Sequence, residues 1–530
     1  MRSSASTPTW WPGSVGYEVY VRSFADSDGD GLGDLEGVRS HLDYLQWLGI
    51  DVVWLTPFFP SPDFDHGYDV SDYRGVDPRM GDLAGFARLV DEIHRRRMRV
   101  IIDVVPNHSS SRHPFFVQAR ADRTSPYRDW YLWSDPSVDG GPPNNWVSHF
   151  GGPAWSLDAD SGQYYCHLFH REQPDLNWRN RDVRRYFVET ITYWCERGVD
   201  GFRVDVAHGL LKDPGLRDNP ARPATGTRRS AFEDFVHRFD LDQDDTPVLY
   251  GTWAEAAARY DACLLGEVGA SGPDRIARYT KGGGLHSAFF LESTGQEWQP
   301  AELLARFRAM HTAEPDRMSW VLDNHDQPRS STRFGGGAGG ARRSLALMTL
   351  LFGLGGVPFL YQGQELGLED GAVDPADRQD PIAHHNPTSL GRDGSRTAMP
   401  WSPGPGNGFS TGLPWLRAAD RTPDETVSSQ QADPGAEVHR YRSLIAARKS
   451  YPDLWRASAT WLDGPSPEFA MLRRGSVLVA VNLADHEQAA LLPPGPWQVV
   501  YESGAPDLVD TVHNAQLAIP DATGVILVRS

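Results

Sequence analysis

The chain has 530 residues and a formal net charge of −19, from 51 Lys and Arg against 70 Asp and Glu. This acidic excess is spread along the chain, so it indicates a solvated acidic surface and disfavours nucleic acids and anionic membranes as partners. The length is sufficient for several cores, and the fold therefore needs neither disulfides nor an obligate partner. The 18 Trp residues indicate either a large core or an aromatic-lined cleft.

The cysteines and the N-terminus bear on the cellular compartment. Cys166, Cys195 and Cys263 are far apart and odd in number, which disfavours a disulfide framework or a thiolate zinc site. Residues 1–13 lack the apolar core of about 7–15 residues that a signal peptide contains. No window approaches the ~18 consecutive apolar residues of a membrane span. We therefore expect a cytoplasmic protein with no membrane partner, unless processing has removed an export signal.

Eight short apolar runs alternate with longer helical patterns between residues 16 and 365. The runs are Tyr17–Val21, Val52–Thr56, Val100–Val105, Gly201–Val206, Cys263–Val268, Ala288–Leu291, Trp320–Leu322 and Val357–Tyr361. Runs of this kind are typical of parallel strands that helices cover on both faces. Between the first two runs, apolar residues recur every three or four positions from Leu35 to Leu48, as on one face of an amphipathic helix. The alternation predicts an α/β fold, a closed (β/α)8 TIM barrel.

The spacing of the runs predicts additional domains. The segment between the third and fourth runs is too long for one crossover helix and predicts a small inserted domain. After the eighth run, an aperiodic stretch rich in Asp, Pro and Gly indicates an excursion over the barrel mouth. A helix over Glu437–Ser450 and alternating segments such as Ser476–Asn482 and Trp497–Tyr501 predict a C-terminal antiparallel β domain. The predicted bounds are 1–105 and 179–455 for the barrel, 106–178 for the insert, 366–432 for the excursion and 456–530 for the β domain.

Carboxylates gather at the ends of the predicted strands, where the catalytic groups of such barrels lie. Asp205 ends the fourth run, Glu267 lies in the fifth, and Asp326 follows the seventh. A single aspartate at such a position is explained by helix capping. Three carboxylates exceed what capping requires and predict an acid/base active site. The basic residues that flank them in the sequence are His108, Arg203 and His325.

Paired carboxylates without a reactive thiol, a serine elbow or a phosphate loop suit the cleavage of a glycosidic bond. One carboxylate attacks the anomeric carbon, and a second, with a raised pKa, protonates the leaving oxygen. The many Trp and Tyr residues agree with this chemistry, because aromatic rings can cover the apolar face of a sugar.

These residues lie in motifs that are also found in a known family. The chain resembles the α-amylase superfamily, glycoside hydrolase family 13, over nearly its whole length, and within it the oligo-1,6-glucosidase and α-glucosidase group. The matching stretches, in chain order, are Asp26–Leu35 (DSDGDGLGDL), Asp103–His108 (DVVPNH), Gln173–Asn177 (QPDLN), Gly201–Asp205 (GFRVD), Gly266–Val268 (GEV) and Asn324–Asp326 (NHD).

The resemblance implies a role for each of the three carboxylates. Asp205 would be the nucleophile that forms a covalent glucosyl-enzyme, and Glu267 the general acid and then the base that activates water. Asp326 would hold two sugar hydroxyls and stabilise the transition state. The same resemblance implies that His108 and His325 bond hydroxyls of that glucose and that Arg203 keeps Asp205 ionised and oriented. An Arg two residues before an Asp on a strand points to the same face, and its charge lowers the carboxyl pKa.

A pair of charged residues is expected to close the pocket. In the family pattern, Tyr68 stacks under the glucose and Asp65 binds the non-reducing end, with Arg396 as the partner of Asp65. Such a pair would exclude a longer chain. The alternative interpretations are a rim aromatic for Tyr68 and a surface arginine for Arg396.

Oxygen donors after the first run have the spacing of a cation-binding loop. Asp26, Asp28, Asp30 and Asp34 occupy positions 1, 3, 5 and 9, and the Leu32 carbonyl supplies position 7. Position 12 lacks the Glu of an EF-hand, so a calcium sensor is excluded. The resemblance implies a structural Ca²⁺ or Mg²⁺ ion at this place, and the alternative is a metal-free, solvated acidic turn. We expect no organic cofactor.

These observations predict a retaining, exo-acting α-glucosidase that acts on small α-glucosides. Three alternatives stay open: α-1,6 specificity, a transglucosylase or a sucrose- or trehalose-forming isomerase with the same three carboxylates, and a non-catalytic binding protein. Val206 after the nucleophile favours α-1,6 cleavage, whereas the wider stretch 204–209 (VDVAHG) favours α-1,4, which we expect. The oligomeric state does not follow from the sequence.

Overall fold

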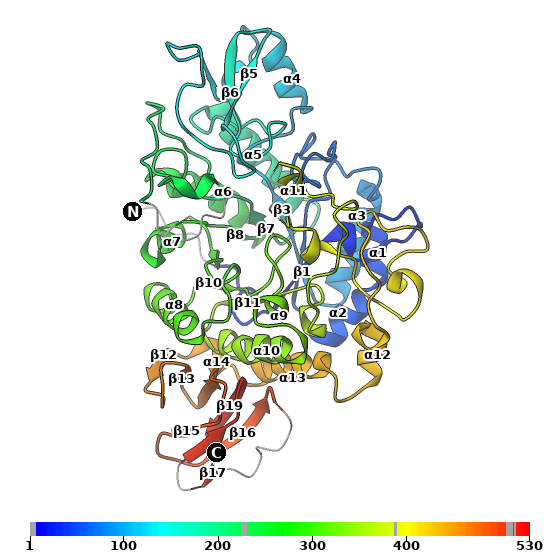
Figure 1. Ribbon diagram of the computed structural model, residues 1–530, viewed down its shortest axis with the longest axis vertical. Helices are drawn as coiled ribbons and strands as arrows, with labels where there is room; N and C mark the ends of the chain where they lie inside the picture. The colour runs from blue at the N-terminus through cyan, green and yellow to red at the C-terminus, as the bar shows by residue number, and fades with distance from the viewer. Residues whose placement is uncertain are drawn as a thin grey trace.

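A computed structural model describes residues 7–223, 231–270, 272–282, 284–385, 390–504, 512–513 and 516–529. A barrel lies at the centre of the molecule, with a small sheet above it in the view and further sheets below it (Figure 1). The small sheet lies within residues 133–166, and the further sheets belong to the C-terminal part of the chain. The predicted fold class, a (β/α)8 barrel with an insert and a C-terminal β domain, is confirmed.

The barrel consists of parallel strands in the closed order β1-β11-β10-β9-β8-β7-β3-β2. The strands are β1 (Gly16–Val19), β2 (Val52–Leu55), β3 (Arg99–Val104), β7 (Gly201–Val204), β8 (Cys263–Gly266), β9 (Ser287–Phe290), β10 (Met318–Trp320) and β11 (Val357–Tyr361). Each of the eight predicted runs overlaps a barrel strand. The seventh was placed two residues late, because the apolar run Trp320–Leu322 continues past the end of β10 into the loop that carries Asp326.

Helices surround the barrel. They are α1 (Leu35–Ser40), α2 (Leu42–Leu48), α3 (Leu83–Arg95), α5 (Arg181–Cys195), α6 (Thr246–Ala257), α7 (Pro273–Thr280), α8 (Pro300–Ala313), α9 (Ser330–Arg333) and α10 (Gly337–Gly353). The predicted helix between Leu35 and Leu48 is two helices that meet at His41. The His41 ring contacts the Gly37 carbonyl and packs 3.9 Å from the Trp401 ring, so tertiary packing accounts for the break.

The barrel interior and the helix-facing sides of the strands form separate cores. Inside the barrel, Trp54, Ile101, Leu265, Phe289 and Phe359 pack as one buried cluster. Strand residues between them point outward and pack on the helices, because side chains alternate along a strand. The ends of the strands are thereby held in fixed positions around the mouth of the barrel.

The segment after β3 forms the small sheet, in the order β4-β6-β5. Its elements are α4 (Pro114–Ala121), β4 (Trp133–Ser134), β5 (Trp155–Asp158) and β6 (Gln163–Cys166). A buried ion pair of 2.8 Å between Asp175 and Lys212 ties it to the segment after β7. Asp175 also forms an isolated β-bridge with His108, which fixes His108 beside the barrel mouth.

The excursion after β11 runs along one side of the barrel mouth, beside α1 and α3 (Figure 1). It contains η5 (Gln364–Leu366), α11 (Pro381–His385), η6 (Asp393–Arg396) and α12 (Val427–Ala432). The indole N–H of Trp401 donates to the Phe24 carbonyl at 2.6 Å, and the Met399 N–H to the Ser23 carbonyl at 2.8 Å. These bonds hold the irregular segment against the loop after β1.

Helix α13 (Glu437–Ser450) has the predicted bounds and leads through α14 (Asp453–Arg456) to the C-terminal sheets. The strands are β12 (Ala459–Leu462), β13 (Phe469–Arg474), β14 (Val477–Asn482), β15 (Gln488–Leu491), β16 (Trp497–Glu502), β17 (Val512–His513), β18 (Gln516–Ile519) and β19 (Thr523–Arg529). They form two antiparallel sheets, β12-β13-β14-β19-β16 and β15-β18-β17. Among the described residues, no helix is both long enough and apolar enough to cross a membrane.

Candidate active site

Arg203 is the centre of the cluster of predicted catalytic residues. Its side chain is 2 % exposed and points into the barrel from β7. One guanidinium nitrogen lies 2.8 Å from Asp103 Oδ1 and 2.6 Å from Asp205 Oδ1, and the other lies 2.9 Å from Glu267 Oε2. Asp103 is opposite Arg203 in the β3–β7 register, and β8 ends just before Glu267. Three strand ends therefore converge on one buried cation.

The backbone after Asp205 is strained in a way that serves this cluster. Val206 has φ of 43°, a left-handed conformation that is unusual for a β-branched residue. Such a conformation costs on the order of 1–3 kcal/mol. It directs the Val206 N–H to Glu267 Oε2 at 2.9 Å. A main-chain donor thus links the two predicted catalytic carboxylates.

Burial and mutual repulsion control the charge of the cluster. Burial raises the pKa of Asp205 well above its ordinary range, and the Arg203 guanidinium opposes that rise. Burial also raises the pKa of Asp103, to about 6, again against the effect of Arg203. Burial therefore favours the protonated forms of Asp205 and Asp103, and the Arg203 guanidinium favours their ionised forms.

Asp326 faces a different environment. Burial raises the pKa of this carboxyl, but His325, Arg392 and Arg396 together hold it below its usual range. Its Oδ1 lies 2.9 Å from Arg396 Nη2 and 3.3 Å from Arg392 Nη1, and its Oδ2 lies 3.3 Å from His325 Nε2. Asp326 is thus held as an anion.

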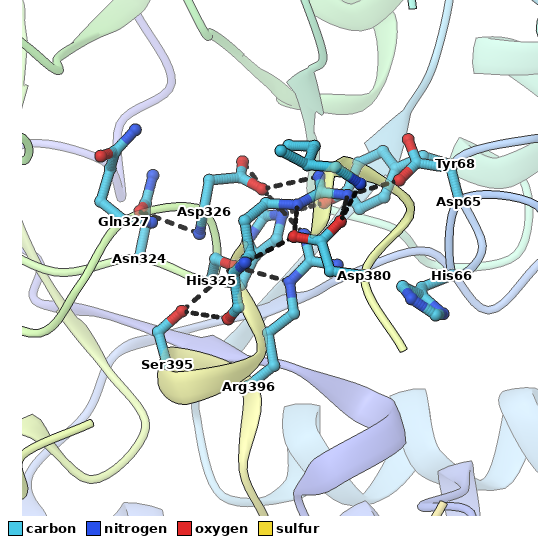
Figure 2. A network of polar contacts seen from close by, with 12 residues as sticks. Asp65, His66, Tyr68, Asn324, His325, Asp326, Gln327, Asp380, Ser395 and Arg396 are labelled. Carbon is cyan, nitrogen blue, oxygen red and sulfur yellow. Dashed lines mark hydrogen bonds and ion pairs between the residues drawn. The ribbon is translucent and has the colours of Figure 1, made fainter. Parts of the chain in front are cut away.

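The predicted Asp65–Arg396 pair is wrong, because the partner of Asp65 is Arg392. Arg392 Nη2 lies 2.7 Å from Asp65 Oδ1 and 2.9 Å from Asp380 Oδ1. Arg396 is fully buried behind Asp326, where it also donates to the His325 carbonyl at 2.8 Å. In Figure 2, Asp65, Asp326 and Asp380 converge from separate parts of the chain.

Sequence reasoning missed Arg392 and Asp380. Arg392 lies four residues before Arg396 in the same stretch, and a second arginine at that spacing was the available signal. Nothing in the local sequence marks Asp380, which reaches the site only through the tertiary path of the excursion. Gln173 belongs to a quoted motif but was not assigned a role. Its amide donates to Asp65 Oδ2 at 3.0 Å.

The remaining predicted residues line the same cavity, of about 820 Å³. Tyr68 stacks on the His325 ring, with ring centres 5.3 Å apart, and its hydroxyl lies 2.8 Å from His325 Nε2. His108 Nε2 lies 3.1 Å from the Tyr68 carbonyl. The predicted residues along the cavity wall are Asp65, Tyr68, His108, Asp205, Glu267, His325 and Asp326. Arg203 and Arg396 lie behind this wall and act on it through Asp205 and Asp326.

The outer part of the cavity is aromatic. The His149 ring lies between Phe169 and Phe232, with ring centres 4.6 and 3.7 Å away. These three residues line the cavity from the inserted sheet region and from the segment after β7. A polar inner end and an aromatic outer wall suit a molecule that is hydroxyl-rich at one end.

The predicted cation loop lies apart from this cavity. Asp26, Asp28 and Asp34 offer carboxylate oxygens within 4.8 Å of one another, the hard donors that Ca²⁺ and Mg²⁺ prefer. Asp30 is outside that group, and its Oδ1 accepts the Leu32 N–H at 2.7 Å. These three carboxylates fit a divalent cation, which stays a prediction.

Comparison with known proteins identifies relatives over nearly the whole chain. A "Probable alpha-glucosidase" of Rhizobium meliloti is 37 % identical over 501 residues, 91 % of each chain. An "Oligo-1,6-glucosidase" of Parageobacillus thermoglucosidasius is 35 % identical and covers 83 % of this chain and 84 % of its own. The crystal structure of an alpha-glucosyl transfer enzyme superposes with a TM-score of 0.92 at 37 % identity, covering 99 % of this chain and 100 % of that one.

The family model described as "Alpha amylase, catalytic domain" matches residues 18–457. That range contains the barrel from the third residue of β1 onward, the inserted sheet region, the excursion and every residue of the Arg203 cluster. The chain therefore belongs to the α-amylase family, glycoside hydrolase family 13, and is a glycoside hydrolase.

Proposed function

We propose that the protein is a retaining, exo-acting α-glucosidase that releases glucose from the non-reducing ends of short α-glucosides. The observation that carries this proposal is the inner end of the cavity. There Arg392 pairs with both Asp65 and Asp380, so charged side chains stand where a longer chain would continue. A glucose at this end can bond to those charges through its outer hydroxyls, and it has no path for another sugar beyond it.

The chemistry assigned to the Arg203 cluster follows the retaining mechanism. Asp205 attacks the anomeric carbon, and Glu267 donates its proton to the glycosidic oxygen as the bond to the leaving alcohol breaks. Both Val206 and Arg203 donate to Glu267 Oε2, so we assign the transferable proton to Oε1. Water then attacks the anomeric carbon of the glucosyl ester and gives a proton to Glu267. The bond between that carbon and Asp205 breaks, which releases glucose. Asp326, held as an anion, stabilises the positive charge that develops on the sugar.

We favour α-1,4 over α-1,6 linkages because of the wider stretch 204–209 (VDVAHG), although Val206 by itself favours α-1,6. The named relatives include both an α-glucosidase and an oligo-1,6-glucosidase, so they support the coarser assignment equally. The deciding measurement is the ratio of kcat/KM for maltose to that for isomaltose. A ratio above one supports the α-1,4 proposal, and a ratio below one rejects it while leaving the α-glucosidase assignment intact.

A second candidate function, glucosyl transfer to an alcohol, is favoured by the aromatic outer wall of the cavity. Rings such as Phe169 and Phe232 can bind an acceptor and compete with water for the glucosyl-enzyme. Analysis of all products from maltose and from sucrose separates the two functions. Hydrolysis gives monosaccharides alone, whereas transfer gives new oligosaccharides or isomers.

A further inference from the structure

Glu18 is a buried carboxyl group inside the barrel that the proposed function does not use. It is the third residue of β1, and its neighbours Tyr17 and Val19 belong to the core packed on the helices. Glu18 therefore points inward, and it is 1 % exposed. Its Oε1 lies 2.5 Å from Nδ1 of His325, a residue of the cavity wall.

The ring of His325 is held rigidly, so only the position of its proton is open. The ring lies between Tyr20 and Tyr68, with ring centres 5.5 and 5.3 Å away and both planes within 12°. Its Nε2 lies 2.8 Å from the Tyr68 hydroxyl and 3.3 Å from Asp326 Oδ2. The Tyr68 hydroxyl donates in turn to Asp103 Oδ2 at 3.2 Å. A chain of contacts thus connects Glu18 to the cluster around Arg203.

An ionised Glu18 beside a neutral ring does not satisfy this chain. Nδ1 would carry the proton and donate to Glu18, which leaves a lone pair on Nε2 facing the Asp326 carboxylate. The Tyr68 hydroxyl would have to donate to Nε2. Its oxygen lone pairs would then face Asp103, and two contacts would join acceptors to each other.

A protonated Glu18 satisfies every contact in one direction. The carboxylic acid donates to His325 Nδ1, and the ring proton sits on Nε2, facing Asp326 and the Tyr68 oxygen. Tyr68 then donates to Asp103 without conflict. A charged ring beside an ionised Glu18 would also place a proton on Nε2, but it would bury two full charges.

The surroundings of both groups favour the neutral arrangement. Burial raises the pKa of Glu18 well above its ordinary range; Arg203 opposes the rise, and the negative Asp326 and Asp103 add to it. Burial lowers the pKa of His325, Asp326 opposes that shift, and the positive Arg396, Arg203 and Arg392 add to it. A neutral acid beside a neutral imidazole is consistent with both directions.

We propose that Glu18 is a positioning residue, a buried carboxylic acid that donates to His325 Nδ1 and thereby keeps the ring proton on Nε2. That proton faces the cavity side occupied by Asp326, where a substrate hydroxyl can accept it. The part of the proposal that concerns the substrate rests on the proposed function. The part that concerns the proton does not.

Nitrogen NMR of protein labelled with ¹⁵N-histidine tests the proton position directly. The His325 signals are assigned as those absent from the spectrum of His325→Asn. We expect Nε2 to carry a proton and Nδ1 to carry none, with no titration between pH 5 and 8. A proton on Nδ1, or a doubly protonated ring, would overturn the proposal. This measurement needs no activity, so it stands even if the proposed function fails.

Kinetics of Glu18 variants test the consequence. The amide of Glu18→Gln can donate to Nδ1 as the acid does, so this variant should keep most of the activity on maltose. Glu18→Met has similar length and no donor, and we expect kcat to fall about 10–100-fold with a smaller change in KM. If folded Glu18→Gln loses as much kcat as Glu18→Met does, the residue acts through its charge, and the proposal is wrong. Full activity of Glu18→Met would also reject it.

A matched control separates this effect from general damage to the core. Glu365 is likewise a buried glutamate, and it accepts hydrogen bonds from the hydroxyls of Tyr17 and Tyr44 at 2.8 and 2.6 Å. It does not line the cavity. Glu365→Met should lower the melting temperature and leave the kcat of the folded protein and the His325 nitrogen signals unchanged. Wild-type protein inactive on every α-glucoside would reject the proposed function, while the NMR result alone would still decide the role of Glu18.

Discussion

Asp65 and Arg392 form an ion pair of 2.7 Å across 327 positions of the chain, with side chains only 5 % and 12 % exposed. The pair joins the loop after β2 to the excursion, and both residues line the cavity. Arg392 also contacts Asp326 and Asp380, so a single guanidinium lies against three carboxyl groups. Removing it takes the ion-pair partner from the buried Asp65 and Asp380, whereas Asp326 keeps Arg396.

Arg392→Ala should therefore lower kcat/KM for maltose by an amount equivalent to about 2–5 kcal/mol, as for the loss of one partner of a buried charge pair. The control is Arg417→Ala in the same excursion. Arg417 is 62 % exposed, and its ion pair with Asp377 is long, at 4.0 Å. That variant should match the wild type. Equal activity of both variants would contradict the role assigned to Arg392.

Asp205→Asn should remove nearly all activity, about 10⁴-fold or more, because the amide cannot form the glycosyl ester. The fold should persist, since Asn has the same shape as Asp. Burial raises the pKa of Asp205, so the site already favours a neutral side chain. Asp244→Asn, at a carboxylate that is 81 % exposed, is the control. Activity and the far-UV circular dichroism of both variants check this prediction.

The first glucose released by the wild type should be the α-anomer in NMR spectra, and initial β-glucose would exclude retention.

The acid sensitivity of the fold should follow from buried histidines such as His286. Burial lowers the pKa of His286 from the ordinary 6.5 to about 4, so between these values the unfolded chain binds a proton that the folded chain does not. Stability is therefore fully present above pH 6.5 and falls as the pH drops toward 4. One such group contributes a slope of up to about 1.4 kcal/mol per pH unit in that window.

The variant His286→Asn isolates this contribution. The Asn oxygen can accept the Leu264 N–H that His286 Nδ1 accepts at 2.9 Å, and it does not titrate. The free energy of unfolding should then depend less steeply on pH between 6.5 and 4. His486→Asn, at a ring that is 67 % exposed, should keep the wild-type slope. Identical slopes in all three proteins, from urea titrations at several pH values, would show that His286 is not responsible.

The barrel could be predicted from the sequence because each strand is a local apolar run. β7 and β8 are buried on both faces, so they are apolar throughout apart from functional residues such as Arg203. The same locality explains the correct bounds of α13. The break at His41 could not be predicted, because it depends on contact with Trp401 from a distant segment.

The positions of the site residues could be predicted where these residues follow strands. They could not be predicted where the residues come from irregular segments. Asp205 and Asp326 have positions fixed by β7 and β10. Arg392 and Asp380 reach the cavity through the path of the excursion, which has no periodicity from which to infer orientation. Two arginines four residues apart offered no local reason to choose between them, and the wrong one was paired with Asp65.

Removal of divalent cations should lower thermal stability if the Asp26 loop binds one. Binding to the folded state alone adds stability by mass action, so Ca²⁺ or Mg²⁺ should raise the melting temperature of chelator-treated protein. Asp28→Asn removes one of the three clustered carboxylates and should abolish this response. Glu36→Gln, a nearby residue outside that group, should retain it. Activity at low temperature should change little, because these residues do not line the cavity. A melting temperature unaffected by both chelator and added cation would leave the loop as a metal-free turn.

The proposed exo-acting function makes a final prediction about products. An exo-acting enzyme binds one terminal glucose against Asp65 and Arg392 and cleaves the bond next to it. Maltopentaose should therefore yield glucose and maltotetraose first, and soluble starch should be a poor substrate beside maltose, because its chains offer few free ends. A site of this kind would exclude an internal chain segment, and a terminal sugar without the outer hydroxyls would leave buried charges poorly solvated. Column analysis of the earliest products provides the measurement. Early maltose and maltotriose would mean that sugars extend past Asp65, and the exo-acting assignment would have to be abandoned even if Asp205 proved to be the nucleophile.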